Sequence, residues 1–248
     1  MTSTRKEIHS AIRRHQDVQR ATHCQNFFKT GKGEYGEGDL FLGVRVPELR
    51  KLSTTYKHIS LDDAVYFLKS RYHEDRQFAL FVLILQFKKA APDIREKIYQ
   101  VYLDHTRYIN NWDLVDASAH QIVGYYLSDK DRSMLYDLVQ SDDLWERRIA
   151  IIATFFFIKT NDFHDALKLS EILLPDTHDL IHKAVGWMLR EIGKRDLKTE
   201  KTFLNKHYPN IPRTALRYAI EKFPEPERKK YLSGNHTDIS VNVPAKHL

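Results

Sequence analysis

Apolar residues recur along nearly the whole chain at intervals of three and four positions, the spacing that places side chains on one face of an α-helix. Residues that favour helix starts stand where these stretches begin. Ser60 precedes LDDAVYFL, with Asp63 at the position that can reach back to it, and Asp142 and Asp143 precede LWERRIAIIATFFFIK. Further helices are expected to open at prolines, namely Pro47, Pro92 and Pro212. The pattern predicts an all-α protein of roughly twelve helices joined by short links.

Three segments depart from this helical period. FLGVRV at 41–46 is the best strand candidate, but it is short and stands alone. GKGEYGEG at 31–38 predicts a loop between two helices. The end of the chain, from GNHTDIS onward, shows no helical period, so we expect residues 233–248 to form a disordered C-terminal tail. The remaining residues, 1–232, are expected to form one domain.

Four of the expected helices share one layout, a polar start followed by a basic or amide residue and then apolar positions. They cover residues 73–87, 142–156, 178–191 and 212–223. Arg148, Lys183 and Arg217 occupy matching positions, 35 and 34 residues apart (183 − 148 and 217 − 183). A helix-pair repeat of this length is typical of an α-solenoid. Basic residues in one register would then line the concave face, which favours nucleic acid as the partner.

Composition and charge narrow the class of protein. With 42% hydrophobic and 29% charged residues, the chain resembles an ordinary soluble globular protein. Its net charge of +6 favours nucleic acid only if the basic residues cluster. The single cysteine, Cys24, excludes an internal disulfide and indicates a reducing compartment. No signal peptide or membrane-spanning run is visible, so we expect a cytoplasmic protein.

Several kinds of chemistry are disfavoured by the residues present. Gly31, Gly33 and Gly36 match the spacing of a dinucleotide-binding loop, but no strand precedes them, and Glu34 and Glu37 would repel a phosphate. The thirteen histidines are scattered, and no HExxH motif or second cysteine offers a zinc site. Cys24 itself is expected to be a packing residue. We therefore expect neither a metal nor another cofactor.

The stretch NNWDLVDASAH at 110–120 places Trp112 and Asp116 on one helical face, four residues apart. An Asp inside a helix must be solvated, paired or hydrogen-bonded. A structural ion pair with Arg148, about one repeat later, would satisfy it, and so would a functional role as an acid. Spacing alone leaves these two interpretations level. Trp145, by contrast, is expected to be an ordinary core aromatic residue.

Three segments, NNWDLVD, LWERRIAII and HKAVGWMLRE, resemble the signature segments of the AlkD-type bacterial DNA alkylation repair glycosylases. GEYGEGDLFLGVRVPELRKL resembles the N-terminal segment of many relatives, and the resemblance covers about residues 5–230. It implies an arch of HEAT-like helical repeats that cradles duplex DNA and excises purines alkylated at N3 or N7. It also implies that Asp116 is the essential acid, that Arg148 is the arginine of the catalytic site, and that Trp112 and Trp187 flank the lesion.

Two positions depart from the family pattern. The tryptophan doublet of the best-known members is Asn111-Trp112 here, and an N-terminal tyrosine often placed near the lesion corresponds to Phe27. We expect the basic residues of the later repeats to contact phosphates, while a solvated surface is their simpler interpretation. These residues are Lys183, Arg190, Arg213 and Arg217.

The function expected from the resemblance is that of a monofunctional alkylpurine DNA glycosylase for base excision repair. Its partner would be double-stranded DNA with alkylated bases, and we expect a monomer that does not bind membranes. The alternative is a non-catalytic helical-repeat protein that binds damaged or branched DNA. A third hypothesis is a protein-interaction scaffold, a common use of α-solenoids.

Overall fold

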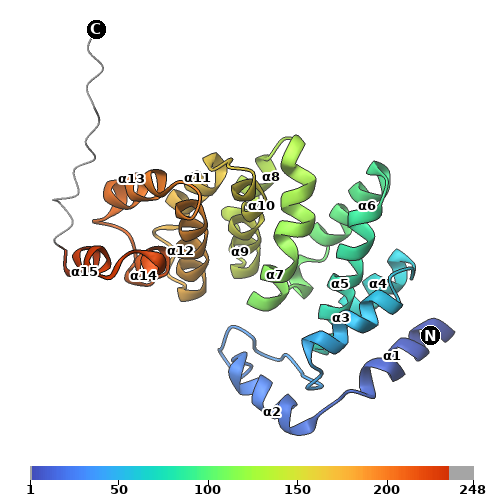
Figure 1. The fold of residues 1–248 in the computed structure, drawn as a ribbon. Coiled ribbons are helices and arrows are strands. Elements are labelled where there is room, and N and C mark those ends of the chain that lie inside the picture. The colour runs from blue at the N-terminus through green and yellow to red at the C-terminus, as the bar shows by residue number, and fades with distance from the viewer. Residues whose placement is uncertain (1, 235–248) are drawn as a thin grey trace. The chain divides into compact units, whose positions relative to one another are not determined.

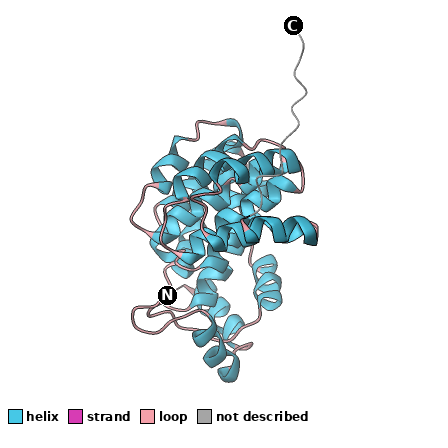
Figure 2. Ribbon diagram, turned by 90° about the vertical axis from the view of Figure 1, so that its left-hand side faces the viewer, coloured by secondary structure: helices cyan, strands magenta, loops and turns pink. Residues whose placement is uncertain are grey.

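The computed structural model describes residues 2–234, and in these residues the regular structure is helical (Figures 1 and 2). No strand is present in this range. The segment 41–45 is an irregular loop, and the one β-bridge joins Leu40 to Tyr72. The prediction of an all-α protein is confirmed. No helix of residues 2–234 is both long and apolar enough to cross a membrane.

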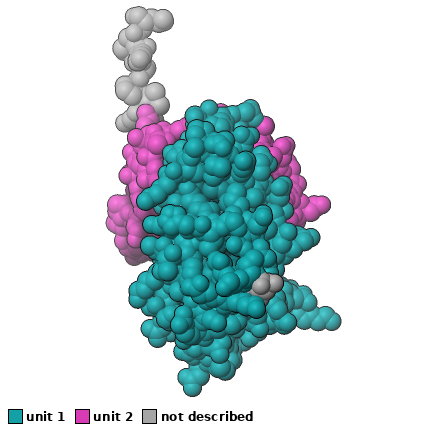
Figure 3. All heavy atoms as spheres, turned by 90° about the vertical axis from the view of Figure 1, so that its right-hand side faces the viewer, with its two compact units in different colours: residues 1–132 teal, residues 133–248 magenta. Residues whose placement is uncertain are grey.

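The chain divides into two compact units, residues 1–132 and 133–248 (Figure 3). The single domain expected over residues 1–232 stays a prediction. Of the expected tail, Ser233 is the last residue of the final helix, and residues 235–248 lie outside the described part.

Unit 1 begins with helices linked by short loops, except for the longer segment 28–45. Its helices are α1 (Ser3–Arg13), α2 (Val18–Phe27), α3 (Val46–Thr55), α4 (Leu61–Leu68), α5 (His73–Lys89), α6 (Pro92–Leu103) and α7 (Trp112–Ala119). Short 3₁₀ turns lie at Thr106–Tyr108 and Leu127–Asp129, and a π-helical turn at His120–Gly124 continues α7.

Unit 2 has the same build of short helices. They are α8 (Ser133–Val139), α9 (Leu144–Ala153), α10 (Phe155–Lys159), α11 (His164–Leu173), α12 (Asp179–Gly193), α13 (Leu197–His207), α14 (Arg213–Ala219) and α15 (Glu225–Ser233), with a 3₁₀ turn at Ile220–Lys222. The four segments with a shared layout become α5, α9 with α10, α12, and α14 with its 3₁₀ turn.

Side chains at the predicted starts form helix caps. The Ser60 hydroxyl accepts from the Asp63 amide at 3.1 Å, and the Asp143 carboxylate accepts from the Trp145 amide at 2.6 Å. The Asp63 carboxylate does not reach back to the cap, because it pairs with Arg5 of α1 at 2.6 Å. Each cap satisfies an amide that the helix leaves without a partner.

The core of unit 1 lies around α5, which packs against α3, α4 and α7 (Figure 1). Residues 73–84 of this helix are all buried, and so is Phe87. By contrast, α2 has no buried residue, and Val18 and Phe27 are 77% and 55% exposed. Helix α2 is therefore held by its flanking segments rather than by a hydrophobic face of its own.

In unit 2, α12 packs against α14, and the two backbones approach closely at Gly186. A Cβ atom at Gly186 would lie 2.4 Å from the carbonyl oxygen of Ala215, so this contact requires glycine. Trp145 is 7% exposed, as expected for a core aromatic residue.

Glu200 of α13 is a buried acid whose Oε1 has no hydrogen-bond partner. Burial raises its pKa from 4.5 to about 8, against the opposing charges of Lys201 and Arg190. Because the folded pKa is the higher one, the folded state loses stability as the pH rises from 4.5 through 8, by about 1.4 kcal/mol per pKa unit. We expect Glu200→Gln to be more stable than wild type at pH 9 and equal to it at pH 4. Urea unfolding at both pH values measures this difference, and an equal stability at pH 9 would contradict it.

Candidate active site

Helix α7 begins at Trp112, and its start is fixed by the residue before it. Asn111 is fully buried, has an extended backbone, and its Oδ1 accepts from the Trp112 amide at 2.9 Å. The Trp112 ring is half-buried and stacks on Phe28, with centroids 5.3 Å apart and an interplanar angle of 24°. Phe27 meets the same indole edge-on at 6.1 Å. The Trp112 indole is thus held in one orientation by two residues at the end of α2.

A buried ionic cluster lies behind the first turn of α7. His73 of α5 donates from Nε2 to Asp113 Oδ2 at 2.8 Å and from Nδ1 to Asp39 at 3.0 Å. Burial, the largest influence, lowers the pKa of His73, but the charge of Asp113 and the hydrogen bonds to both carboxylates outweigh it and raise this pKa to about 9. Gln77 also donates to Asp113, at 3.0 Å, and Arg76 pairs with Asp39. The imidazolium therefore ties α7 to α5 and to the loop that carries Asp39.

Asp116 lies one turn after Trp112 and is half-buried. Its negative charge is close enough to raise the pKa of the buried Tyr102 hydroxyl, although burial is the main cause of that shift. Asp113 and Asp116 thus differ in position: Asp113 belongs to the ionic cluster, and Asp116 shares the helical face of Trp112.

The helix that carries Asp116 changes its hydrogen-bonding pattern directly after α7. Residues His120–Gly124 form a π-helical turn, and the helix resumes at Tyr125. Such turns are rare in proteins as a whole. Those that occur often lie at functional sites, because the inserted residue changes the direction of neighbouring side chains. This feature sets α7 apart from the other described helices.

The glycine-rich loop packs against Asn111. A Cβ atom at Gly36 would lie 2.5 Å from the Phe28 carbonyl oxygen and 3.4 Å from Asn111 Nδ2. Glu34 accepts from the Gly31 amide and Glu37 from the Gly33 amide, both at 2.8 Å. The amides that a phosphate would need are therefore bound by the loop's own glutamates.

We expect Asn111→Trp, which restores the family doublet, to destabilise the protein. The tryptophan side chain could not accept the hydrogen bond from the Trp112 amide, and it is too large for the space beside Gly36. Overpacking of this kind costs about 1–3 kcal/mol. Asn111→Ala is the matched control, because it removes only the cap and costs about 1 kcal/mol. Chemical unfolding measures both variants. A tryptophan variant as stable as the alanine variant would show that the loop tolerates the doublet.

In unit 2, Arg148 and Trp187 lie on α9 and α12. Arg148 is 4% exposed, and its Nη1 donates to the Leu180 carbonyl in the first turn of α12. Trp187 is half-buried, donates from Nε1 to Glu191 at 3.2 Å, and contacts the Phe155 ring at 5.6 Å. Arg148 therefore also links two helices of this unit, a role that the sequence did not predict.

The four basic residues expected at phosphates differ in their surroundings. Lys183 pairs with Asp179 at 2.8 Å, and Arg190 pairs with Glu221. Arg213 donates to the Leu232 carbonyl at 2.9 Å. Arg217 is exposed and has no ion-pair partner among residues 2–234. Their contact with DNA stays a prediction.

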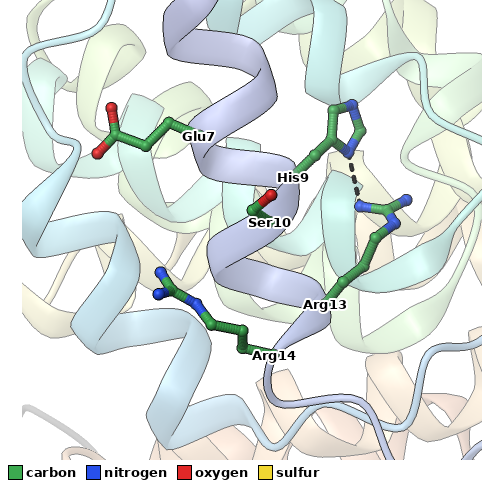
Figure 4. A pocket seen from close by; sticks show the side chains of 5 residues that line it. All are labelled: Glu7, His9, Ser10, Arg13 and Arg14. Atoms are coloured by element: carbon green, nitrogen blue, oxygen red, sulfur yellow. Dashed lines mark hydrogen bonds between the residues drawn. The ribbon is translucent and has the colours of Figure 1, made fainter.

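A hollow of about 700 Å³ on α1 is lined by charged side chains (Figure 4). Arg13 bonds to His9 at 2.6 Å and pairs with the buried Asp75 of α5 at 3.3 Å. Glu7 accepts from the Tyr56 hydroxyl at 2.9 Å. These contacts hold α1 on unit 1, so its charged residues have a structural use.

The ionic cluster and the stacking of Phe28 on Trp112 were not predicted from the sequence. The signal for the cluster is the run HEDRQ at 73–77, five polar residues directly before the apolar run FALFVLIL at 78–85. All five are buried. Such a run is buried only if its charges have partners. Asp39 and Asp113 partner His73, Arg76 and Gln77, Arg13 pairs with Asp75, and the amides of residues 42–44 bind Glu74, so every one of these partners lies about thirty residues or more away in the sequence.

Comparison with known proteins identifies the family. The model of a family described as DNA alkylation repair enzyme matches residues 8–223. This chain belongs to that family, and the resemblance to AlkD-type proteins is confirmed. No curated protein matches the sequence.

Solved structures of similar fold include the following two. The first is a protein from Enterococcus faecalis described as a "Predicted DNA alkylation repair enzyme", with a TM-score of 0.67 and 15% sequence identity over 85% of this chain and 98% of that one. The second is AlkD2 from Streptococcus mutans, with a TM-score of 0.54 and 17% identity over 84% of this chain and 99% of that one. At these identities the likeness concerns the fold, which is that of AlkD-type helical-repeat proteins.

Proposed function

We propose that this DNA alkylation repair enzyme is a monofunctional glycosylase that releases purines alkylated at N3 or N7 from duplex DNA. The observation that carries the proposal is the shared face of Trp112 and Asp116 on α7. The start of this helix is fixed by the Asn111 cap and by the cluster of Asp113 and His73. A fixed helix start presents an acid and an aromatic surface in a set geometry, which catalysis requires.

The chemistry needs few groups. A purine alkylated at N3 or N7 carries a positive charge, and it leaves as a neutral base when it takes the electron pair of the glycosidic bond. No general acid is needed for this leaving group. The sugar becomes oxocarbenium-like, and the Asp116 carboxylate would stabilise its positive charge and orient a water molecule. The water oxygen then bonds to C1′, and its proton passes to Asp116 or to solvent.

The remaining residues would bind the DNA. The Trp112 indole would contact the cationic lesion or its deoxyribose, an interaction worth about 0.5–2 kcal/mol. The resemblance gives Trp187 the same role and assigns the Arg148 guanidinium to a backbone phosphate. We expect the protein to act as a monomer in the cytoplasm.

Two assays separate this function from its alternatives. Release of N7-methylguanine and N3-methyladenine from alkylated DNA is expected above the spontaneous rate. A non-catalytic binder of damaged or branched DNA would bind with a steep salt dependence and release no base. A protein-interaction scaffold would bind no DNA even at about 50 mM salt. If the wild-type protein released bases no faster than the DNA loses them without protein, the glycosylase proposal would be refuted.

A further inference from the structure

A cavity of about 310 Å³ lies within unit 1, between α2, the start of α3 and α5. Its apolar lining includes Phe28, Phe41 and Val44. Its polar lining includes Gln77, which is 5% exposed, and Cys24 also lines it. Trp112 and Asp116 do not line this cavity, so it is distinct from the face proposed for catalysis.

The acids that line the cavity already have partners. Both oxygens of Glu74 are used, because they accept from the amides of Leu42, Gly43 and Val44 at 2.7–3.2 Å. Asp113 accepts from His73 and Gln77, as described above. These carboxylates therefore stabilise the fold and leave no demand for a cationic ligand.

The two arginines that line the same cavity, the half-buried Arg20 and the exposed Arg45, have no such partners. Neither Arg20 nor Arg45 forms an ion pair with an acid of residues 2–234, and Arg20 Nε is buried without a hydrogen-bond partner. The Gln77 carboxamide oxygen likewise receives no hydrogen bond from the described residues. Two guanidinium groups without partners favour an anionic group, and phosphate suits their geometry.

The size and lining indicate what accompanies the anion. A volume of about 310 Å³ lies at the small end of the range for ligand pockets, roughly 300–1,000 Å³. Phe28 and Phe41, whose rings stack with centroids 5.0 Å apart, offer an aromatic wall, and a side-chain amide such as that of Gln77 can pair with the edge of a nucleobase. A single flat heterocycle joined to a phosphate satisfies all of these groups together.

We propose that this cavity binds one nucleotide, with the base against Phe28 and Phe41 and the phosphate on Arg20 and Arg45. The nucleotide is either a free mononucleotide or an unstacked nucleotide of bound DNA. In the second case the inference rests on the proposed function, since the DNA bound there would be the substrate duplex or its opposite strand.

Cys24 provides the readout, because it is the chain's one cysteine and lines the cavity. Burial raises the pKa of its thiol, so labelling with a disulfide reagent is best followed near pH 8.5. We expect saturating deoxynucleoside monophosphate, or a duplex with a one-nucleotide bulge, to slow the labelling of the full chain at least 5-fold. Whichever of these two ligands protects Cys24 identifies the source of the nucleotide. A fully paired duplex should protect Cys24 much less.

The variants test the anion site. Arg20→Gln and Arg45→Gln are each expected to lower the affinity for the protecting ligand about 10-fold. Arg14→Gln on α1 is the matched control, and we expect it to leave this affinity unchanged. Labelling unchanged by mononucleotide and by bulged duplex would overturn the proposal. The proposal would also be overturned if bulged and paired duplexes protected Cys24 equally and mononucleotides did not protect it. Full protection of Cys24 in the Arg20/Arg45 double variant would overturn it as well. Base release is measured separately, so the glycosylase proposal can fail while this one stands, and the reverse.

Discussion

Asp116→Asn is expected to lower the rate of base release at least 100-fold while the protein stays folded. Asparagine keeps the shape of the side chain but removes the charge that would stabilise the oxocarbenium-like sugar. Removal of one such electrostatic group costs on the order of 10²–10³ in rate. Single-turnover release from alkylated DNA, with urea unfolding of the same sample, measures both quantities.

Asp113→Asn is the matched control, because the same change is made three residues earlier on the same helix. Asp113 accepts from the buried imidazolium of His73, and removal of one partner of a buried pair costs about 3–5 kcal/mol. We therefore expect this variant to lose stability first. If Asp116→Asn unfolds as easily as Asp113→Asn and retains its rate, Asp116 is a structural residue.

The second large effect is a loss of stability at alkaline pH caused by His73. Its folded pKa of about 9 lies above its ordinary value of 6.5, so the folded state binds the proton more tightly than the unfolded state. The stabilisation is fully present below pH 6.5 and is lost as the pH rises through 9. At about 1.4 kcal/mol per pKa unit, the loss amounts to about 3 kcal/mol.

His73→Gln isolates this effect from other groups that titrate in the same range, including Glu200. The variant is expected to be less stable than wild type at pH 6, because two buried carboxylates lose their cation. The gap between the two proteins should narrow by about 3 kcal/mol at pH 10. Guanidinium unfolding at the two pH values measures the gap, and a gap that does not change with pH would mean that His73 is neutral in the folded protein.

The helices could be predicted from the sequence because their causes are local. The apolar spacing, the caps at Ser60 and Asp143 and the proline at Pro92 act within a few residues. The strand candidate at 41–46 could not be resolved this way. Its amides bind the Glu74 carboxylate of α5 rather than a neighbouring strand, and that partner lies about thirty residues away.

The candidate site could be predicted only in part for the same reason. Spacing placed Trp112 and Asp116 on one face, but it gave no means of distinguishing the roles of Asp113 and Asp116. That distinction depends on His73, forty residues before Asp113 in the sequence. The departure at Asn111 also finds its explanation in a distant contact, because the buried cap packs beside Gly36 of the glycine-rich loop.

Release of N7-methylguanine from a duplex that carries this base at one position tests the central claim most directly. The wild-type protein in excess over DNA is predicted to release the base at least 100-fold faster than the same duplex without protein, and Asp116→Asn is predicted to match the rate without protein. Wild-type release at the rate without protein, under conditions in which the duplex is fully bound, would contradict the claim.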